Sequence, residues 1–382
     1  MTKFAGKLLK NNFQRTRNVT ISNFTTVDEI KKDQDEIKPT FLLKDGIETV
    51  AAVSCWVSPK RTRSYPFARV LHTLYQKDCK KITIIPVVKD EGGNMPELRK
   101  KPYGDRDYLQ YATVMMMTFL GVYLIPAYYV DAELNNRPSE RKKMKITKQK
   151  FDSIFISKKI QEILKTKKTV QEWNDSIRDS ISEDLADVIK EKYTNIQRKT
   201  GGKLHDLDVM HKFLKNTFDP DNFKSKSARS SAGAAKGETQ TSNKKEKTFG
   251  FPKAQISFNI KDIPGECDLT TDGYHIINET LFLLECKHSK NGIKADDIED
   301  ALFKYHFFNQ INEFSDGNST YDTKTVIVAS SEGKTTKEIL SELNEISEEC
   351  EKNSIIFIPI GKNDLKNGKE KILQKLDSIA KN

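Results

Sequence analysis

The hydrophobic residues of this chain change their spacing several times, and these changes predict alternating strands and helices. Between residues 48 and 133, apolar β-branched runs alternate with segments in which apolar residues recur every three or four positions. The runs predict strands at 48–57, 81–88 and 122–133, and the segments between them predict helices at 66–77 and 105–120. This order is typical of a layered α/β arrangement around a largely buried sheet.

The rest of the chain divides by the same criterion. Isoleucine and leucine recur at helical intervals among many charges between residues 141 and 218, which predicts a mainly helical segment. After residue 249 the pattern returns to strands and helices and predicts a compact α/β unit. We therefore predict four parts: an N-terminal α/β region for recognition or assembly, a helical region leading into the core, a basic linker, and the core itself (1–150, 151–222, 223–248 and 249–382).

The linker is defined by its composition. Residues 224–247 are rich in Ser, Ala, Gly and Lys and contain no large apolar side chain. Such a segment cannot bury enough apolar surface to offset the entropy of ordering. Its lysines either contact a phosphate backbone or form part of a solvated tether, and both interpretations stay open.

Charge and cysteine content narrow the class of protein. The formal net charge is +10 and 31% of the residues are charged, so the field of the protein attracts polyanions without identifying one. The five cysteines are scattered and lack C-x-x-C spacing, which argues against a disulfide framework or a zinc site. Together with an N-terminus that lacks a secretory signal pattern, this favours a reducing, cytoplasmic location.

One uncharged stretch, residues 109–130, is long enough to span a bilayer. It also contains Gln110, Thr113, Gly121 and Pro126, and tyrosines fill its second half. We therefore predict a buried helix to about Leu120 followed by a buried strand, and no membrane partner.

Two short strings in the predicted core place charges within apparent strands. They read Glu266-Cys267-Asp268 and Glu285-Cys286-Lys287. Because alternate side chains of a strand share a face, Glu285 and Lys287 lie on one side and Cys286 on the other. The apolar residues 281–284 predict a strand buried on both faces. Charges buried there without partners cost several kcal/mol, so they require compensation.

A metal ion would supply that compensation if the two strands were antiparallel neighbours. Asp268 and Glu285 would then converge at one end, with Lys287 beside them. Mg²⁺ or Mn²⁺ relieves the repulsion of two carboxylates, polarises a phosphate and acidifies a bound water. Lys287 would position or activate the nucleophile. A salt-bridged hairpin arising by chance in a Lys- and Glu-rich chain is the alternative, although the apolar neighbours of Glu285 favour catalysis.

The stretch GECDL, followed one hairpin later by LFLLECK, resembles the signature of the PD-(D/E)XK nuclease superfamily. That superfamily includes type II restriction endonucleases, Holliday junction resolvases and RecB-like nucleases. The resemblance matches Asp268 to the first acid, Glu285 to the second and Lys287 to the lysine, and it implies that the backbone carbonyl of Cys286 also faces the metal. It further implies a restriction-endonuclease-like core, in which a mixed central sheet is flanked by helices.

Other residues are candidates for supporting roles. Glu266 precedes the first acid, Asp208 lies with Asp206 in the segment before the linker, and Lys304 lies on the helix after the motif, where it could contact phosphate. His275 and His288 are predicted to be structural or surface residues. In the N-terminal region, basic residues alternate with aromatic ones and form either a nucleic-acid contact or a solvated loop: Lys60, Arg61, Arg63 and Arg69.

These observations predict a Mg²⁺-dependent DNA endonuclease that hydrolyses phosphodiester bonds, most like a type II restriction or other defence nuclease. The sequence lacks a P-loop and a zinc module, which favours a stand-alone enzyme. Double-stranded DNA is the expected substrate, a homodimer would cut both strands most simply, and a cognate methyltransferase would accompany a restriction enzyme. A structure-selective resolvase or repair nuclease, and a non-catalytic nucleic-acid-binding protein, are the alternatives.

Overall fold

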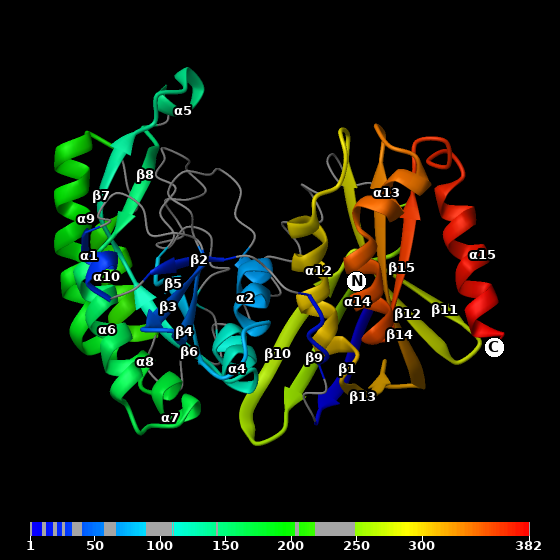
Figure 1. Cartoon of the computed structure of the whole chain (residues 1–382), viewed down its shortest axis with the longest axis horizontal. Helices are drawn as coiled ribbons and strands as arrows, with labels where there is room; N and C mark the ends of the chain where they lie inside the picture. The colour runs from blue at the N-terminus through cyan, green and yellow to red at the C-terminus, as the bar shows by residue number, and fades with distance from the viewer. Residues whose placement is uncertain are drawn as a thin grey trace. The chain divides into compact units, whose positions relative to one another are not determined.

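The chain folds into two compact units, which we call unit 1 (Met1–Val19 and Ala228–Asn382) and unit 2 (Thr20–Ser227). Figure 1 shows the elements of both. The structure is a computed structural model, and it describes residues 2–9, 13–17, 21–24, 27–32, 40–56, 66–88, 109, 111–142, 144–202, 206–217 and 249–381. The predicted linker, 223–248, lies outside these residues.

Unit 2 is built on a five-stranded sheet in the order β2-β3-β4-β5-β6, in which only β3 and β4 pair antiparallel. Its strands are β2 (Ser22–Phe24), β3 (Thr40–Asp45), β4 (Glu48–Cys55), β5 (Lys80–Pro86) and β6 (Val122–Ala127), with a separate antiparallel pair of β7 (Tyr129–Leu134) and β8 (Ile146–Phe151). Its helices are α1 (Val27–Lys32), α2 (Pro66–Leu74), α4 (Tyr111–Phe119), α5 (Pro138–Lys142), α6 (Ser153–Lys165), α7 (Val170–Asp175), α8 (Ile177–Ser180), the π-helix η1 (Ile181–Leu185), α9 (Ala186–Thr200) and α10 (Leu207–Thr217).

The uncharged stretch 109–130 lies in this unit. It forms the buried helix α4, a turn at Gly121, and then the buried strand β6, which confirms the prediction of a helix followed by a strand. Gly121 adopts a φ of 73°, a conformation that glycine reaches without steric cost. Among the helices that the structure describes, none is both long and apolar enough to cross a membrane.

Unit 1 contains a mixed eight-stranded sheet, in the order β10-β9-β1-β13-β14-β12-β11 with β15 also paired to β14. Its strands are β1 (Thr2–Leu8), β9 (Ala254–Ile260), β10 (Ile263–Thr271), β11 (Gly273–Ile277), β12 (Thr280–Ser289), β13 (Ile311–Ser315), β14 (Thr320–Ser331) and β15 (Ile355–Ile360). Its helices are α12 (Ala295–Phe308), α13 (Thr336–Glu342), α14 (Asn344–Lys352) and α15 (Gly368–Ala380). The prediction of a mixed sheet flanked by helices is thus confirmed.

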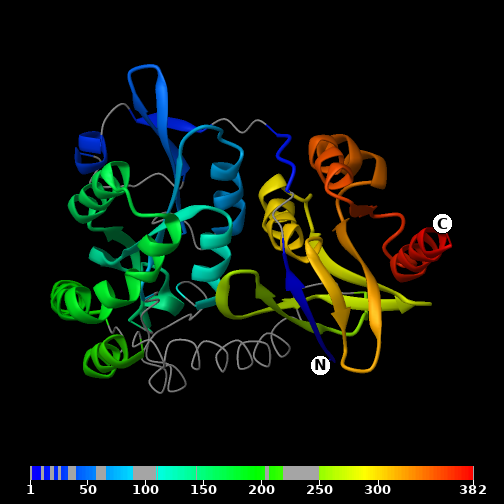
Figure 2. The same ribbon diagram turned by 90° about the horizontal axis from the view of Figure 1, so that it is seen from below.

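Strand β12 occupies the interior of this sheet. It pairs antiparallel with β11 on one edge and parallel with β14 on the other, and helix α12 makes the crossover to β14. Phe282, Leu284 and Cys286 pack with Ile372 and Leu376 of α15 in one hydrophobic cluster. The alternate residues of β12 face the side on which α12 lies, so the two helices cover opposite faces (Figure 2). Leu281 to Leu284 are all fully buried, as their uninterrupted apolar run predicts.

The boundaries of the predicted regions differ from the structure in two places. Strand β1 belongs to unit 1, where it lies between β9 and β13, and not to an N-terminal region that extends from residue 1 to residue 150 (Figure 1). The helices between residues 153 and 217 belong to unit 2, where α6 contacts β5 and β6 and α9 contacts β7. They complete the layers of unit 2 and do not lead into the core of unit 1.

Candidate active site

Glu285 of β12 is the centre of a buried cluster of charges. Only 4% of the residue is exposed, and both of its carboxylate oxygens accept from lysines. Lys287, two positions along the same strand, donates to Oε1 at 3.1 Å, and Lys304 of α12 donates to Oε2 at 2.7 Å. The predicted pairing of Glu285 with Lys287 on one face is therefore present, and the helix supplies a second ammonium. The carboxylate has the compensation that a buried charge requires.

The second carboxylate of the cluster belongs to Asp272, a residue that the sequence motif did not assign. Asp272 lies between the end of β10 and the start of β11, and its Oδ2 accepts from the backbone N–H of Cys286 at 2.9 Å. Strands β11 and β12 pair antiparallel, with Gly273 opposite Leu284. In the same register the preceding residue, Asp272, lies opposite the residue that follows Leu284, which is Glu285. A Cβ at Gly273 would lie 2.6 Å from Cβ of Phe251, so glycine permits the close approach that sets this position.

The prediction that Asp268 joins Glu285 was wrong, because β10 and β12 are not paired neighbours. Asp268 lies opposite Ser257 of β9, and its Oδ1 accepts from the hydroxyl of Ser257 and from Nε2 of Gln255. It precedes Asp272 by four residues, which is about 13 Å along an extended strand. The carboxylate that lies opposite Glu285 is therefore that of Asp272, and Asp268 has side-chain contacts with β9.

The two carboxyl groups at the centre of the cluster have opposite pKa shifts. Burial opposes ionisation of Glu285, but the charges and hydrogen bonds of Lys304 and Lys287 outweigh it and lower its pKa to about 2. Burial and the charge of Glu285 raise the pKa of Asp272 to about 6, against the smaller opposing influence of Lys304 and Lys287. Divergent pKa values of adjacent acids are characteristic of catalytic and metal-binding sites.

Lys287 remains an ammonium in this environment. Burial acts to lower its pKa, but the charges of Glu285, Asp272 and Asp300 raise the pKa above its ordinary value. A charged lysine can hold a nucleophile or stabilise developing negative charge, whereas a neutral amine would be needed to abstract a proton. The geometry therefore favours the positioning and electrostatic roles of Lys287.

The backbone of Cys286 completes a set of oxygen donors. Its N–H points toward Asp272, and in an extended strand the C=O of a residue points to the same edge as its N–H. The carbonyl of Cys286 and the carboxylates of Asp272 and Glu285 thus border one region. Hard divalent cations such as Mg²⁺ prefer carboxylate and carbonyl oxygens, so these residues suit the predicted metal. The thiol of Cys286 is reduced and lies in the hydrophobic cluster on the opposite face, as is expected of a small packing residue.

Helix α12 brings further groups to the cluster. Besides Lys304, which was predicted to contact phosphate and here binds Glu285, it carries Asp300 and Tyr305. Tyr305 is fully buried, its hydroxyl has no hydrogen-bond partner among the described residues, and burial followed by the charges of Glu285 and Asp272 raises its pKa well above the usual value. In sequence, Tyr305 follows Ile298 and Leu302 at helical intervals, which predicts an ordinary packing residue. Its proximity to the charges of Glu285 and Asp272 is a feature of the tertiary structure.

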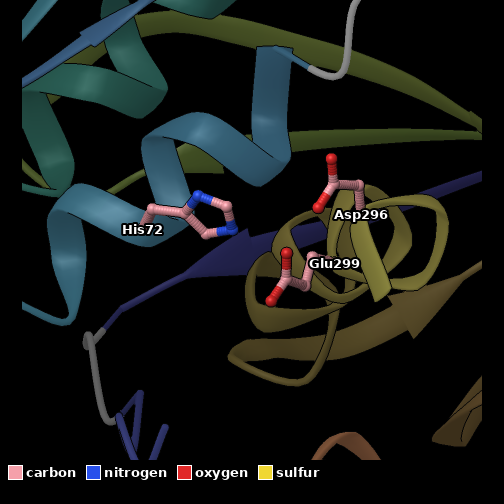
Figure 3. A group of neighbouring side chains, drawn as sticks. All are labelled: His72, Asp296 and Glu299. Carbon is pink, nitrogen blue, oxygen red and sulfur yellow. The ribbon is translucent and has the colours of Figure 1, made fainter. Parts of the chain in front are cut away.

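An acidic pair near the start of α12 has a different role. Asp296 and Glu299 are three residues apart and project from neighbouring turns (Figure 3). Glu299 is buried, and its carboxylate forms an ion pair with Arg17. Glu299 therefore serves the packing of the N-terminal segment of unit 1.

The remaining predicted residues lie away from the cluster or outside the described part of the chain. Glu266 forms an exposed ion pair with Lys3 at 3.7 Å, and Asp208 forms one with Lys190 at 2.7 Å in unit 2. Arg69 is buried and donates to the carbonyl oxygen of Cys55 at 2.9 Å, which favours a structural role over a nucleic-acid contact. Lys60, Arg61 and Arg63 lie outside the described residues.

The two histidines of the core have partners that agree with their predicted structural or surface role. Nδ1 of His288 lies 2.9 Å from Oγ of Ser330, and its Nε2 lies 3.4 Å from a carboxylate oxygen of Glu332. His275 lies opposite Phe282 in the β11–β12 hairpin, and its ring contacts that of Phe251.

Comparison with known proteins does not assign a family. No family model and no curated protein matches the chain. The crystal structure of protein VC1899 from Vibrio cholerae gives a match at 14% sequence identity, over 49% of this chain and 42% of that chain, with a TM-score of 0.21. The chain thus spans less than half the length of that protein, and a superposition at this level does not define a shared fold.

The pKa of Asp272 leads to a testable dependence on pH. A metal ion that binds Asp272 must displace its proton, so the affinity for Mn²⁺ is expected to rise with pH up to about 6 and to level off above it. At pH 5 the expected affinity is about tenfold weaker than at pH 7. Calorimetric titration with Mn²⁺ at several pH values measures this. Asp268→Asn should keep the same profile, and equal affinities at pH 5 and pH 7 would contradict the assignment of Asp272.

Proposed function

We propose that this protein is a Mg²⁺-dependent DNA endonuclease with a PD-(D/E)XK-type site. The observation that supports it best is the position of the Asp272 carboxyl opposite Glu285, which in turn binds Lys287. Asp272, Glu285 and the carbonyl of Cys286 would hold the metal. The metal would polarise the scissile phosphate and acidify a water. The resemblance of the LFLLECK segment to that superfamily motif agrees with this arrangement at Glu285 and Lys287, and Asp272 takes the place of Asp268.

Lys287 would perform the steps of catalysis that the metal does not. Lys287, held as an ammonium by the surrounding acids, would orient the attacking water and stabilise the charge that develops on the phosphate. The parallel order of β12, β14 and β15, with α12 as the crossover, supports the proposal of a restriction-endonuclease-like core. A type II restriction or other defence nuclease that acts on double-stranded DNA, as a homodimer and with a cognate methyltransferase, is the form that we propose.

Digestion of supercoiled plasmid by the full chain tests the proposal. The parent is expected to nick and linearise the plasmid in Mg²⁺ and to be inactive in EDTA. Lys287→Ala is expected to slow cleavage about 100-fold, the effect of losing one preorganised group that stabilises transition-state charge. Lys337→Ala, which removes an exposed lysine from α13, is the matched control and should cleave as the parent does.

The cleavage products distinguish a restriction enzyme from the alternative functions, a structure-selective nuclease and a nucleic-acid-binding protein. Discrete fragments with a common end sequence support a restriction enzyme, whereas cleavage confined to junctions or flaps supports a resolvase or repair nuclease. Equal behaviour of the parent and Lys287→Ala, with and without metal, would leave only a nucleic-acid-binding protein.

A further inference from the structure

Lys304 reaches two acceptors that lie on different strands. Its ammonium donates to Oε2 of Glu285 on β12 at 2.7 Å and to the carbonyl oxygen of Thr270 on β10 at 2.9 Å. Its side chain is 16% exposed, so the contact is largely shielded from water. Thr270 precedes Asp272 by two residues. The ammonium therefore connects Glu285 with the strand that leads into Asp272.

This position conflicts with a metal ion held by both acids. Oε1 of Glu285 accepts from Lys287, which continues the same strand, and Oε2 accepts from Lys304. A divalent cation shared between Asp272 and Glu285 needs one of these two oxygens. Of the two lysines, Lys304 also donates to the carbonyl oxygen of Thr270, so it can stay beside the site when it gives up Glu285. Two cations cannot occupy one carboxylate oxygen in a shielded site without strong repulsion. One of them must leave.

We propose that Lys304 is an exchangeable counter-ion: it neutralises Glu285 until a divalent cation binds there, and it then contacts a phosphate of the nucleic acid. This inference rests on the proposed function and adds a second role for the same side chain. Thr270 holds the ammonium beside the site after Glu285 is taken by the metal. A lysine released in this way is a suitable point charge for a phosphate oxygen.

Counter-ion exchange predicts opposite effects of one substitution on metal binding and on catalysis. Lys304→Met removes the competitor, so Mn²⁺ is expected to bind about tenfold more tightly in the absence of nucleic acid. At saturating Mg²⁺ the same variant is expected to cleave plasmid about 100-fold more slowly, because a phosphate contact is lost. A purely structural lysine would weaken both measurements together.

Calorimetric titration of the full chain with Mn²⁺, combined with plasmid cleavage, separates the outcomes. Lys304→Gln is a second neutral variant in case Lys304→Met does not fold, and Lys304→Arg should restore most of the parent affinity and rate. Lys337→Met removes an exposed charge from α13 and should change neither measurement.

The exchange is overturned if both neutral variants bind Mn²⁺ no more tightly than the parent, or if they cleave at the parent rate. A parent that binds Mn²⁺ and cleaves DNA while its neutral variants show no gain in affinity removes this inference alone. A parent that binds no Mn²⁺ removes the proposed function together with it.

Discussion

Asp272→Asn is expected to abolish Mg²⁺-dependent cleavage, whereas Asp268→Asn is expected to leave it close to the parent rate. The first substitution removes a carboxylate that lies opposite Glu285, and the second changes a side chain whose contacts are with Ser257 and Gln255 of β9. The loss in Asp272→Asn should be roughly 1000-fold, because a catalytic metal contributes several kcal/mol and each 1.4 kcal/mol is about tenfold in rate. Plasmid cleavage at saturating Mg²⁺ measures both variants.

The unfolding temperature of Asp272→Asn provides an independent test of the role of Asp272. The folded-state pKa of Asp272 lies near 6, above its ordinary value of 3.8, so the folded protein favours the protonated form and ionisation at neutral pH costs stability. Asparagine is neutral at every pH and can still accept from the N–H of Cys286. Asp272→Asn should therefore unfold at the same or a higher temperature than the parent at pH 7. Loss of activity with no loss of stability would indicate a functional carboxylate.

Two results would contradict this assignment. If Asp268→Asn were inactive and Asp272→Asn active, the functional acid would be Asp268, as the sequence motif predicts. A large fall in the unfolding temperature of Asp272→Asn would show that the hydrogen bond to Cys286 serves the fold, and that the low activity follows from unfolding.

Local sequence pattern was sufficient to place Glu285 and Lys287. Four consecutive apolar residues before them define a strand buried on both faces, and the alternation of side chains then puts both charges on one side. These inferences depend on neighbours within about five positions along the chain, where backbone geometry alone fixes the arrangement.

The error over the first acid arose from strand pairing. The motif spacing suggested one hairpin between Asp268 and Glu285, but β10 pairs with β9, and it is β11 that forms the hairpin with β12. The signal that could have found Asp272 was the turn at 278–279, since register counted back from that turn places residue 272 opposite residue 285. The Asp272-Gly273 dipeptide is itself a turn signal in sequence, as is Asn278-Glu279, and a turn at the first of them conceals the acid.

Long-range pairing was beyond the reach of the sequence pattern. Strand β1 pairs in parallel with β9 across more than half of the chain, and its own sequence contains no mark of its partner. The contact of Lys304 with Glu285 depends on how α12 crosses β12, which periodicity does not determine. Such features arise from tertiary packing, where local propensity is a weak guide.

The segment that follows β1 leads to the second large effect, on stability. Residues 13–17 supply partners for buried polar groups of α12 and α14: Arg17 pairs with Glu299, and the hydroxyl of Thr16 donates to Glu349 at 3.1 Å. Gln14 and Asn353 exchange two hydrogen bonds, from N–H of Gln14 at 2.8 Å and back to its carbonyl oxygen at 2.9 Å. Glu299 and Glu349 are at most 1% exposed. This segment therefore provides polar partners for two buried carboxylates of unit 1.

Arg17→Met is expected to destabilise unit 1 by about 3–5 kcal/mol, because it removes one partner of a buried ion pair, the cation that pairs with the carboxylate of Glu299. For a unit of this size, that corresponds to a fall of about 10 °C in the unfolding temperature. Arg17→Met combined with Glu299→Met should recover most of the loss, since an apolar pair can replace a buried ion pair. Lys3→Met breaks the exposed pair with Glu266 and should change stability by less than about 1 kcal/mol.

Calorimetric scans of the full chain distinguish these cases, and only the transition of unit 1 should move. An Arg17→Met variant that unfolds with the parent would show that water or another group compensates Glu299, and a double variant as unstable as the single one would locate the defect elsewhere. The expected pattern would mean that the buried carboxylate of Glu299 depends on Arg17, which lies outside residues 249–382. Because Glu299 and Lys304 share α12, residues 13–17 of unit 1 would then hold in place the helix that supplies the candidate site with its second ammonium.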